Sequence, residues 1–266
     1  MKKLLFSAAA LAVLFTACKD DDTNPTPQPT KLFLNLVRGT DSISATYNAS
    51  NRIAKYALID SRVGGHSYYN EPVYENNRLV KLNSSEDGPD ALLLNRSYNY
   101  NAAGRVEKIN FHGDDGKVYG FDSLAYDNAG HLVAFYEKEG DYHEKYALVW
   151  DSKGNIIKQH GIRIVDGVES KDTVTTTYTY DDKVNYVAKQ PEIYLMEPGG
   201  PAFGLSANNI LTEKTVWNET NTEEYTNEYT YDEDNYPVTK KSSGKYINNG
   251  TVNTKEENTQ IRYFRK

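Results

Sequence analysis

The sequence predicts an all-β fold: an antiparallel meander of about 14–16 strands, built from repeated β-hairpins and curled into an open barrel-like sheet. Three observations predict it. An aromatic–acid–turn motif recurs about every 26 residues, side chains alternate in character before each turn, and 22 Tyr stand beside only 8 Phe. A fixed period is typical of a repeat architecture, and Tyr and Thr favour strands with one buried face.

The repeated motif has the chemistry of a hairpin turn. Its clearest copies are 100–106 (YNAAGRV), 126–132 (YDNAGHL) and 150–156 (WDSKGNI). Looser copies start at Tyr47, Tyr74, Tyr180 and Tyr231. The Asp or Asn after the aromatic residue suits the first position of a type I turn, and the Gly three residues later suits the last. Each copy therefore predicts one hairpin, with the apolar residue after the turn beginning the second strand.

The spacing of the copies sets the expected strand number. The last gap, from Tyr180 to Tyr231, spans nearly two periods, and we interpret 205–210 near its midpoint as a degenerate copy without the Tyr. Seven clear copies and one degenerate copy predict 14–16 strands. Consecutive hairpins with short connections pair with their neighbours, and a sheet of this size must curl. We expect the curled sheet to stay open.

The first thirty residues predict export. Lys2 and Lys3 precede an apolar run that ends at Phe15, which is too short to span a bilayer. A basic start, an apolar core and small residues are typical of a secretory signal peptide. Thr16-Ala17-Cys18 makes 1–17 resemble a lipoprotein signal, which implies that Cys18 is the lipid anchor. The alternative is an ordinary signal peptide with a Cys after it by chance.

The segment 18–30 predicts a lipidated, disordered tether. Its acidic run 19–22 resembles the signal that sends lipoproteins of certain Gram-negative gut commensals to the outer face of the outer membrane, although any acidic linker looks similar. The stretch 23–30 holds three Pro among polar residues, which favours a stiff, extended chain. We therefore expect an outer-membrane protein that is held by its lipid, faces the cell exterior, and carries a single β domain over 31–266.

The charge of the mature chain excludes some partners. Removal of 1–17 takes away Lys2 and Lys3 and leaves 28 basic against 37 acidic residues, a net charge of −9. Nucleic-acid binding requires a basic footprint, and electrostatic docking on anionic lipid requires a basic surface. Cys18 is the only cysteine, so thiol chemistry and thiolate metal sites are not expected in the β domain.

Two resemblances follow from these motifs. The copy at 126–132 looks like the YD repeat of bacterial surface and toxin-shell proteins. The whole layout, including 204–210 and 229–237, resembles a family of bacterial lipoprotein domains of unknown function with a porin-like fold. The resemblance implies a fold and brings no catalytic residues. A barrel that spans the membrane needs a continuous apolar outer band, whereas Lys138-Glu139 and Glu223-Glu224 place charges on the strands.

No motif predicts a catalytic, cofactor or metal site. The five His are scattered, and neither a nucleophile elbow nor a phosphate-binding Gly loop is present. Acidic clusters occur at 114–116, 181–182 and 232–235. Calcium would accept such oxygens, but each cluster lies at a predicted turn, where Asp caps the backbone. We favour the turn interpretation.

The segment 189–204 departs most from the repeat. It surrounds the apolar run 193–196 with Pro and Gly, and long non-repeat loops inside a domain are often functional. One interpretation is a plug that covers an open end of the sheet, and we favour it. The other is a binding loop in which Tyr194, Phe203 and nearby Trp217 stack on a sugar.

The sequence favours a non-enzymatic surface lipoprotein that binds a glycan or a partner protein. One alternative is a carboxylate-dependent hydrolase that acts on a surface polysaccharide, which would require two Asp or Glu side chains facing inward and away from turns. Another alternative is a structural component of the cell envelope.

Overall fold

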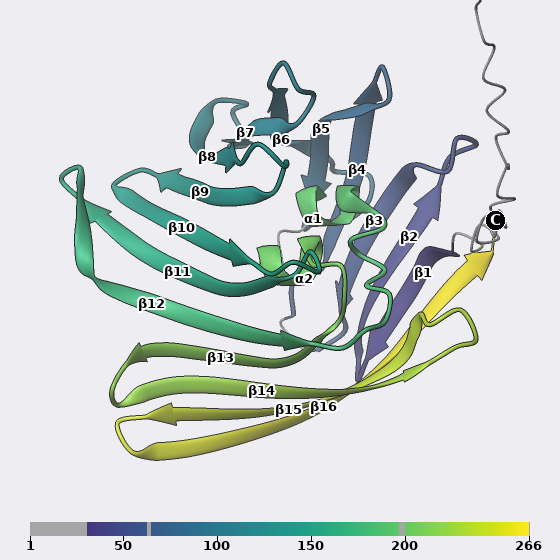
Figure 1. Cartoon of the computed structure of the whole chain (residues 1–266). Helices are drawn as coiled ribbons and strands as arrows, with labels where there is room; N and C mark the ends of the chain where they lie inside the picture. Colours follow the sequence, from purple (N-terminus) through teal and green to yellow (C-terminus); the bar gives the residue numbers. More distant parts are fainter. Residues whose placement is uncertain (1–30, 63–64, 197–199, 266) are drawn as a thin grey trace, which may run out of the picture.

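The structure, a computed structural model, describes residues 31–62, 65–196 and 200–265. The signal peptide 1–17, the Cys18 anchor and the tether 18–30 lie outside these residues. Within the described part, sixteen strands form one antiparallel meander (Figure 1).

The first eight strands are β1 (Lys31–Arg38), β2 (Asp41–Tyr47), β3 (Ile53–Asp60), β4 (Tyr68–Glu75), β5 (Arg78–Ser85), β6 (Leu93–Tyr100), β7 (Val106–His112) and β8 (Val118–Tyr126). The others are β9 (Leu132–Glu139), β10 (Tyr142–Trp150), β11 (Ile156–Val165), β12 (Val168–Tyr180), β13 (Ile210–Asn218), β14 (Asn221–Tyr231), β15 (Pro237–Asn248) and β16 (Thr251–Arg265). Two short helices, α1 (Pro191–Met196) and α2 (Pro201–Leu205), connect β12 to β13.

The sheet closes, so the predicted open sheet is wrong. β16 pairs with β1 in an antiparallel register that runs from Lys31 opposite Arg265 to Arg38 opposite Thr259. Unpaired sheet edges are a liability because they recruit other strands, and closure removes them. The repeat is local and describes one hairpin at a time, so it carried no information about whether the first strand meets the last.

The Asp or Asn of each motif caps its turn, as predicted. The side-chain Oδ1 of Asn101, Asp127 and Asp151 accepts the backbone N–H four residues later, at 3.0, 2.9 and 2.8 Å. The Gly three residues after each has a positive φ, and at Gly130 the φ is 98°. Glycine adopts this conformation without a steric cost. These turns lie together at one end of the barrel.

The motif aromatics tie each hairpin to the previous one. Tyr100 and Tyr126 donate their hydroxyls, and Trp150 its indole N–H, to the carbonyl oxygens of Leu79, Val106 and Leu132, each at 2.8 Å. Each acceptor is the first or second strand residue after the preceding turn. The period of the sequence therefore corresponds to a repeated hydrogen bond that joins each hairpin to the one before it.

The same kind of hydrogen bond occurs beside the seam, where β1 pairs with β16 and the barrel closes. Tyr47 donates to the carbonyl of Phe33 at 2.7 Å, and Tyr263 donates to the carbonyl of Pro237 at 2.9 Å. Phe33 lies opposite Tyr263 in the register, as Val106 lies opposite Tyr100. The start of β1 and the end of β16 therefore occupy the position of an eighth hairpin turn.

The segment 182–208 is an insertion within one turn of the repeat. Asp181 donates its N–H to the carbonyl of Asn209 at 3.1 Å, and its carboxylate accepts the N–H of Asn209 at 3.0 Å. Asp151 and Asn155 make the same two contacts across a normal turn, each at 2.8 Å. The interpretation of 205–210 as a degenerate copy is therefore wrong, because Ile210 completes the copy that starts at Tyr180.

The insertion fills one end of the barrel. A barrel of sixteen strands is wide enough to leave a channel, and α1 and α2 lie within it (Figure 1). Ile193, Met196 and Ala202 join the wall residues in one buried cluster. Residues that follow the turns, such as Leu79 and Ile156, belong to the same cluster. The core of the protein is therefore the plugged end of the barrel.

The charged pairs 138–139 and 223–224 each place one side chain on the outer face of the barrel. Successive residues of a strand point to opposite faces. Glu137 lies opposite the buried Asp122, so Glu139 shares the inner face and Lys138 lies outside. By the same alternation Glu224 faces outward. One charge of each pair thus lies inside the barrel.

Candidate functional site

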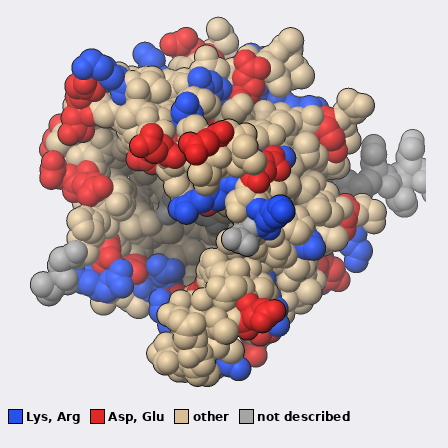
Figure 2. Space-filling view, turned by 90° about the vertical axis from the view of Figure 1, so that its left-hand side faces the viewer, with Lys and Arg blue, Asp and Glu red and all other residues tan. Residues whose placement is uncertain are grey.

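A cavity of about 330 Å³ lies inside the barrel. It is bounded at one end by the described parts of the insertion, 182–196 and 200–208, which we call the plug, and it faces the opposite, open end of the barrel, which we call the mouth. Its walls come from β1 to β3 and from β13 to β16, on both sides of the seam. Figure 2, viewed from the side of the long hairpins, shows the molecule hollowed on this face, with basic and acidic side chains around the opening. The cavity is of a size that proteins use for small ligands.

The plug supplies the aromatic part of the cavity lining. Phe203 is 40% exposed, whereas Tyr186 is 6% exposed and stacks on Phe33 with ring centroids 5.2 Å apart. Tyr186 also meets the edge of Phe203 at 6.5 Å. Asn185 donates its side-chain N–H groups to the carbonyls of Phe203 and Ser206, at 2.7 and 2.8 Å. These contacts hold an exposed apolar ring in place at the cavity.

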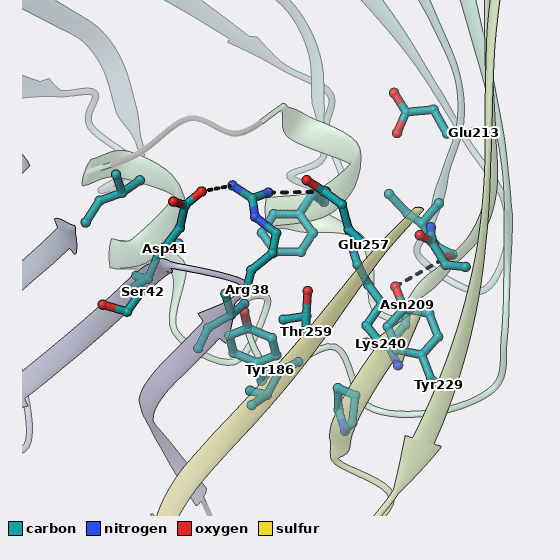
Figure 3. Close-up of a pocket in the computed structure, with 18 residues that line it drawn as sticks. Arg38, Asp41, Ser42, Tyr186, Asn209, Glu213, Tyr229, Lys240, Glu257 and Thr259 are labelled. Carbon is teal, nitrogen blue, oxygen red and sulfur yellow. Dashed lines mark hydrogen bonds and ion pairs between the residues drawn. The ribbon is translucent and has the colours of Figure 1, made fainter. Parts of the chain in front are cut away.

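Three charged side chains form a group at the seam side of the cavity. The guanidinium of Arg38 lies 3.4 Å from a carboxylate oxygen of Asp41 and 3.7 Å from one of Glu257 (Figure 3). Arg38 is half-exposed, so each pair contributes little to stability. The group still matters for recognition of a ligand. Arg38 already has two carboxylate partners, so it attracts an incoming anion less strongly than an unpaired cation would.

Lys240 and Glu213 line the same cavity without such partners. Burial lowers the pKa of Lys240, and so does nearby Arg38, while Glu257 and Glu213 oppose the shift. Burial raises the pKa of Glu213, Glu223 adds to the rise, and Lys240 opposes it. Among the described residues, neither side chain has a hydrogen bond or an ion pair within 4 Å. Two complementary polar groups therefore face the cavity and do not touch each other (Figure 3).

The structure brings together two of the three predicted aromatic residues. Phe203 lines the main cavity and also a second cavity of about 80 Å³, which Tyr194 lines as well. Tyr194 is only 8% exposed and packs against Gly204. Trp217 is 39% exposed, contacts Tyr246 edge-on at 6.1 Å, and lines neither cavity. The described parts of the segment 189–204, which are 189–196 and 200–204, therefore fill one end of the barrel, and Phe203 lines the cavity.

Sequence reasoning missed the charged lining of the cavity. Adjacent Lys240 and Lys241 must point to opposite faces of their strand, and Glu213 alternates with Thr215 on the inner face. This alternation was readable. The alternation does not show which strands meet across the seam, because β1 and β16 are far apart in the sequence.

A row of three carboxylates lies elsewhere on the inner wall. Asp122, Glu137 and Glu144 occupy directly opposed positions on β8, β9 and β10. Burial raises the pKa of Asp122 to about 7, with a further rise from Glu137 and an opposing effect from Arg96. Burial also raises the pKa of Glu137, as does the charge of Glu144. These are inward-facing acids away from turns.

No group of three or more His, Cys, Asp or Glu in the described residues is arranged to hold a metal ion. Nor does any helix in the described part of the chain have the length and apolar character needed to cross a membrane.

Comparison with solved structures identifies the fold. A crystal structure of a porin-like protein from Bacteroides uniformis matches with a TM-score of 0.58 and 15% identity, and the match covers 90% of this chain and 99% of that one. The fold is porin-like. A porin-like protein from Bacteroides vulgatus matches with a TM-score of 0.42 and 10% identity, over 88% of this chain and 99% of that one.

A TcdB2–TccC3–Cdc42 complex matches this porin-like barrel with a TM-score of 0.32 and 12% identity, over 81% of this chain and 14% of that one. No protein-family model and no curated protein matches the sequence. At these identities the comparisons show the fold alone.

Proposed function

We propose that this chain is a lipid-anchored surface protein that binds a saccharide inside its porin-like barrel. The observation that carries the proposal is the cavity of about 330 Å³, which the exposed residue Phe203 lines together with Lys240, Glu213 and other polar groups. Ligand sites combine apolar surface with a few convergent polar groups. A sugar ring has the matching chemistry, since its C–H faces are apolar and its hydroxyls are polar.

The position of the tether supports a site that faces away from the membrane. Lys31 follows the tether and lies at the plugged end, whereas Arg38, at the other end of β1, lines the cavity. A strand rises about 3.3 Å per residue, so roughly 23 Å separates the two. A chain that is anchored through Cys18 would present the mouth of the barrel outward. Outer-membrane attachment and an exterior location remain part of the proposal.

Glycan binding by the full mature chain, purified in detergent, tests the proposal. We expect saccharide binding by calorimetry after a glycan-array screen, and at least a tenfold weaker affinity in Phe203→Ala. Trp217→Ala removes an aromatic side chain that lies off the cavity and should bind as the unaltered protein does. If no saccharide binds, or if both variants bind normally, saccharide binding in this cavity is ruled out.

The carboxylate row gives a second candidate, a hydrolase of surface polysaccharide. Asp122, with a pKa of about 7, has the property of a general acid, and Glu137 lies directly opposite. A pair of carboxyl groups, one of them protonated near neutral pH, is what glycoside hydrolysis requires. We expect Asp122→Asn and Glu137→Gln to lower reducing-sugar release at least a hundredfold. A bound saccharide that stays intact on prolonged incubation would exclude this candidate.

A further inference from the structure

We infer that the cavity selects an uncharged, hydroxyl-rich ligand, a neutral saccharide, which lies between Lys240 and Glu213, and that it disfavours acidic sugars. The inference rests on the proposed saccharide binding and names the class of saccharide. It is carried by which charges in the cavity already have partners and which do not.

The first step is the charge balance of the lining. Arg38 lies within 4 Å of both Asp41 and Glu257, so this group holds one positive and two negative charges. Lys240 and Glu213 remain, one ammonium and one carboxyl group. With every group ionised, the lining itself carries a net charge of −1. Just outside it, Arg62 lies 3.7 Å from Asp41 and Lys255 lies 2.6 Å from Glu257, and Arg62 also pairs with Asp60, so the lining and these partners together are neutral. An incoming carboxylate therefore meets no net attraction, although it passes near two cations.

The second step is the hydrogen-bonding capacity of the two unpaired groups. An ammonium can only donate hydrogen bonds, and an ionised carboxylate can only accept them. A hydroxyl does both. A ligand carboxylate would satisfy Lys240 but leave Glu213 opposed to a like charge, and a ligand ammonium would do the reverse. A neutral ligand with several hydroxyls satisfies both groups at once.

The third step is the register, which separates the two groups. Glu213 on β13 lies opposite Tyr225, and Lys240 on β15 lies opposite Tyr229. Tyr225 and Tyr229 are four residues apart on β14, which corresponds to roughly 13 Å along the strand. Lys240 and Glu213 are therefore not a closed ion pair. An extended ligand with hydroxyls at more than one position fits between them.

The fourth step is the apolar surface. Phe203 is the one large apolar side chain of this lining that is 40% exposed, because the others pack into the barrel wall or the plug. An exposed aromatic ring near unpaired donors and acceptors suits the C–H face of a sugar better than a small inorganic anion. The chemistry of the cavity thus points to a saccharide without a charge.

The test compares two oligosaccharides with the same backbone, one with a hydroxymethyl group and one with a carboxylate at the same carbon. Calorimetry on the full mature chain in detergent measures both affinities, with glucuronate and inorganic phosphate as small-anion probes. We expect the neutral oligosaccharide to bind at least tenfold tighter than the acidic one, and the small anions to give no saturable heat.

Three variants assign the selectivity to residues. Lys240→Met should weaken neutral-saccharide binding about tenfold to a hundredfold, the range for a hydrogen bond to a charged group. Glu213→Gln should reduce the ratio of the affinities for the neutral and the acidic oligosaccharide, because it removes a negative charge that repels the acidic one. Lys241→Met is the matched control, because Lys241 is the next residue, faces outward and lies 3.6 Å from Glu256. It should change neither affinity.

The outcomes separate this inference from the proposed function. Tighter binding of the acidic oligosaccharide overturns the inference and leaves saccharide binding standing, whereas binding of neither overturns both. Normal binding by Lys240→Met, or an equal loss in Lys241→Met, also overturns the inference. Circular dichroism spectra and urea midpoints that match the unaltered protein show that the variants fold. A Lys240→Met chain that misfolds is replaced in the comparison by Lys240→Gln.

Discussion

The hydroxyl of the motif tyrosine explains why this chain uses Tyr where other barrels could use Phe. Tyr126 buries its ring against the plugged end and donates to the carbonyl of Val106. Burial raises the pKa of Tyr126 to about 12, with Arg105 opposing the rise, so the hydroxyl keeps its proton at neutral pH. At Tyr74, Arg52 lies over the ring at 4.7 Å.

Asp122 makes stability depend on pH in an unusual direction. It is 8% exposed, lies near Glu137 and Arg96 on the wall, and helps to raise the pKa of Tyr194 in the plug. Its folded pKa of about 7 lies above the unfolded value, so the folded chain binds the extra proton. The free energy of unfolding should therefore fall, by on the order of 3 kcal/mol, as pH rises from about 4 to about 7.

Asp122→Asn removes this charge, so the variant should lose that part of the pH dependence and be more stable than the unaltered protein at pH 8. Urea unfolding at several pH values measures both effects. Asp114→Asn, at an exposed turn residue, serves as the control and should follow the unaltered protein. Equal curves for the Asp122 variant and the unaltered protein would show that Asp122 does not bind the extra proton.

Gly204 is required by its contact with Tyr194. A Cβ at this position would lie 2.5 Å from Cδ2 of the Tyr194 ring, which is buried and has little room to move. We expect Gly204→Ala to destabilise the chain by about 1–3 kcal/mol, the usual cost of overpacking. Thermal and urea unfolding measure the loss. In Gly113→Ala the nearest atom is at an ordinary 3.5 Å, so this variant should stay within about 0.5 kcal/mol of the unaltered protein.

The plug shows how an element can be added to a repeat protein without disturbing the repeat. Because Asp181 and Asn209 keep the contacts of a normal turn, β12 and β13 pair as any other hairpin does. The inserted chain is then held by the wall. Gln190 accepts the N–H of Phe33 at 2.9 Å and donates to the hydroxyl of Tyr47 at 2.8 Å, next to the seam.

Arg96 fastens the other side of the plug. Its guanidinium donates to the carbonyls of Leu195 and Met196, at 3.1 and 2.7 Å, where α1 ends. We expect Arg96→Met to cost about 1.5–3 kcal/mol. The loss should be confined to the plug, with amide hydrogen exchange in 191–196 accelerated about tenfold to a hundredfold and the barrel strands unchanged.

Arg105→Met is the matched control for this experiment. Arg105 lies over the ring of Tyr126, at 5.6 Å, in a hairpin turn. The variant should leave exchange in 191–196 unchanged. Uniform acceleration across all strands in Arg96→Met would mean that the plug and the barrel unfold as one unit, and no acceleration would mean that Arg96 does not hold the plug.

The barrel as a whole has the start of β1 and the end of β16 where a hairpin turn would be. Lys31 lies opposite Arg265 and forms ion pairs with Asp232 and Asp234 at 2.7 and 2.5 Å, which hold β1 beside the turn that precedes β15. A short linker between 265 and 31 should therefore act as an eighth turn. New ends can then be opened within the turn 127–131.

We expect this circular permutant to fold to the same barrel, with a urea midpoint close to that of 31–266 in its natural order. Far-ultraviolet circular dichroism and urea unfolding measure the outcome. Opening the chain inside β10 instead, between 146 and 147, breaks a strand and should prevent folding. Failure of the turn permutant, with cooperative unfolding lost, would show that the seam is not equivalent to the other hairpin positions.

Much of this architecture could be predicted because it is local. Asp127 and Gly130 encode a turn through contacts within five residues, and the recurrence of their motif predicted a meander with the observed strand number. The closed seam and the cavity could not be predicted in this way. Arg38 and Glu257 are 219 positions apart in the chain and meet only because β16 returns to β1.

The repeat and the turn chemistry are determined by short stretches of sequence, since each depends on neighbours along the chain. Three features depend on strands that are distant in sequence: the closure of the sheet, the placement of 182–196 and 200–208 inside the barrel, and the ion pairs of Arg38. The same holds for Lys240 and Glu213, which line the cavity and have no ion-pair partner among the described residues. The physical reason is that hydrogen-bonded turns form from adjacent residues, whereas a cavity is the space left when a sheet closes around an insertion.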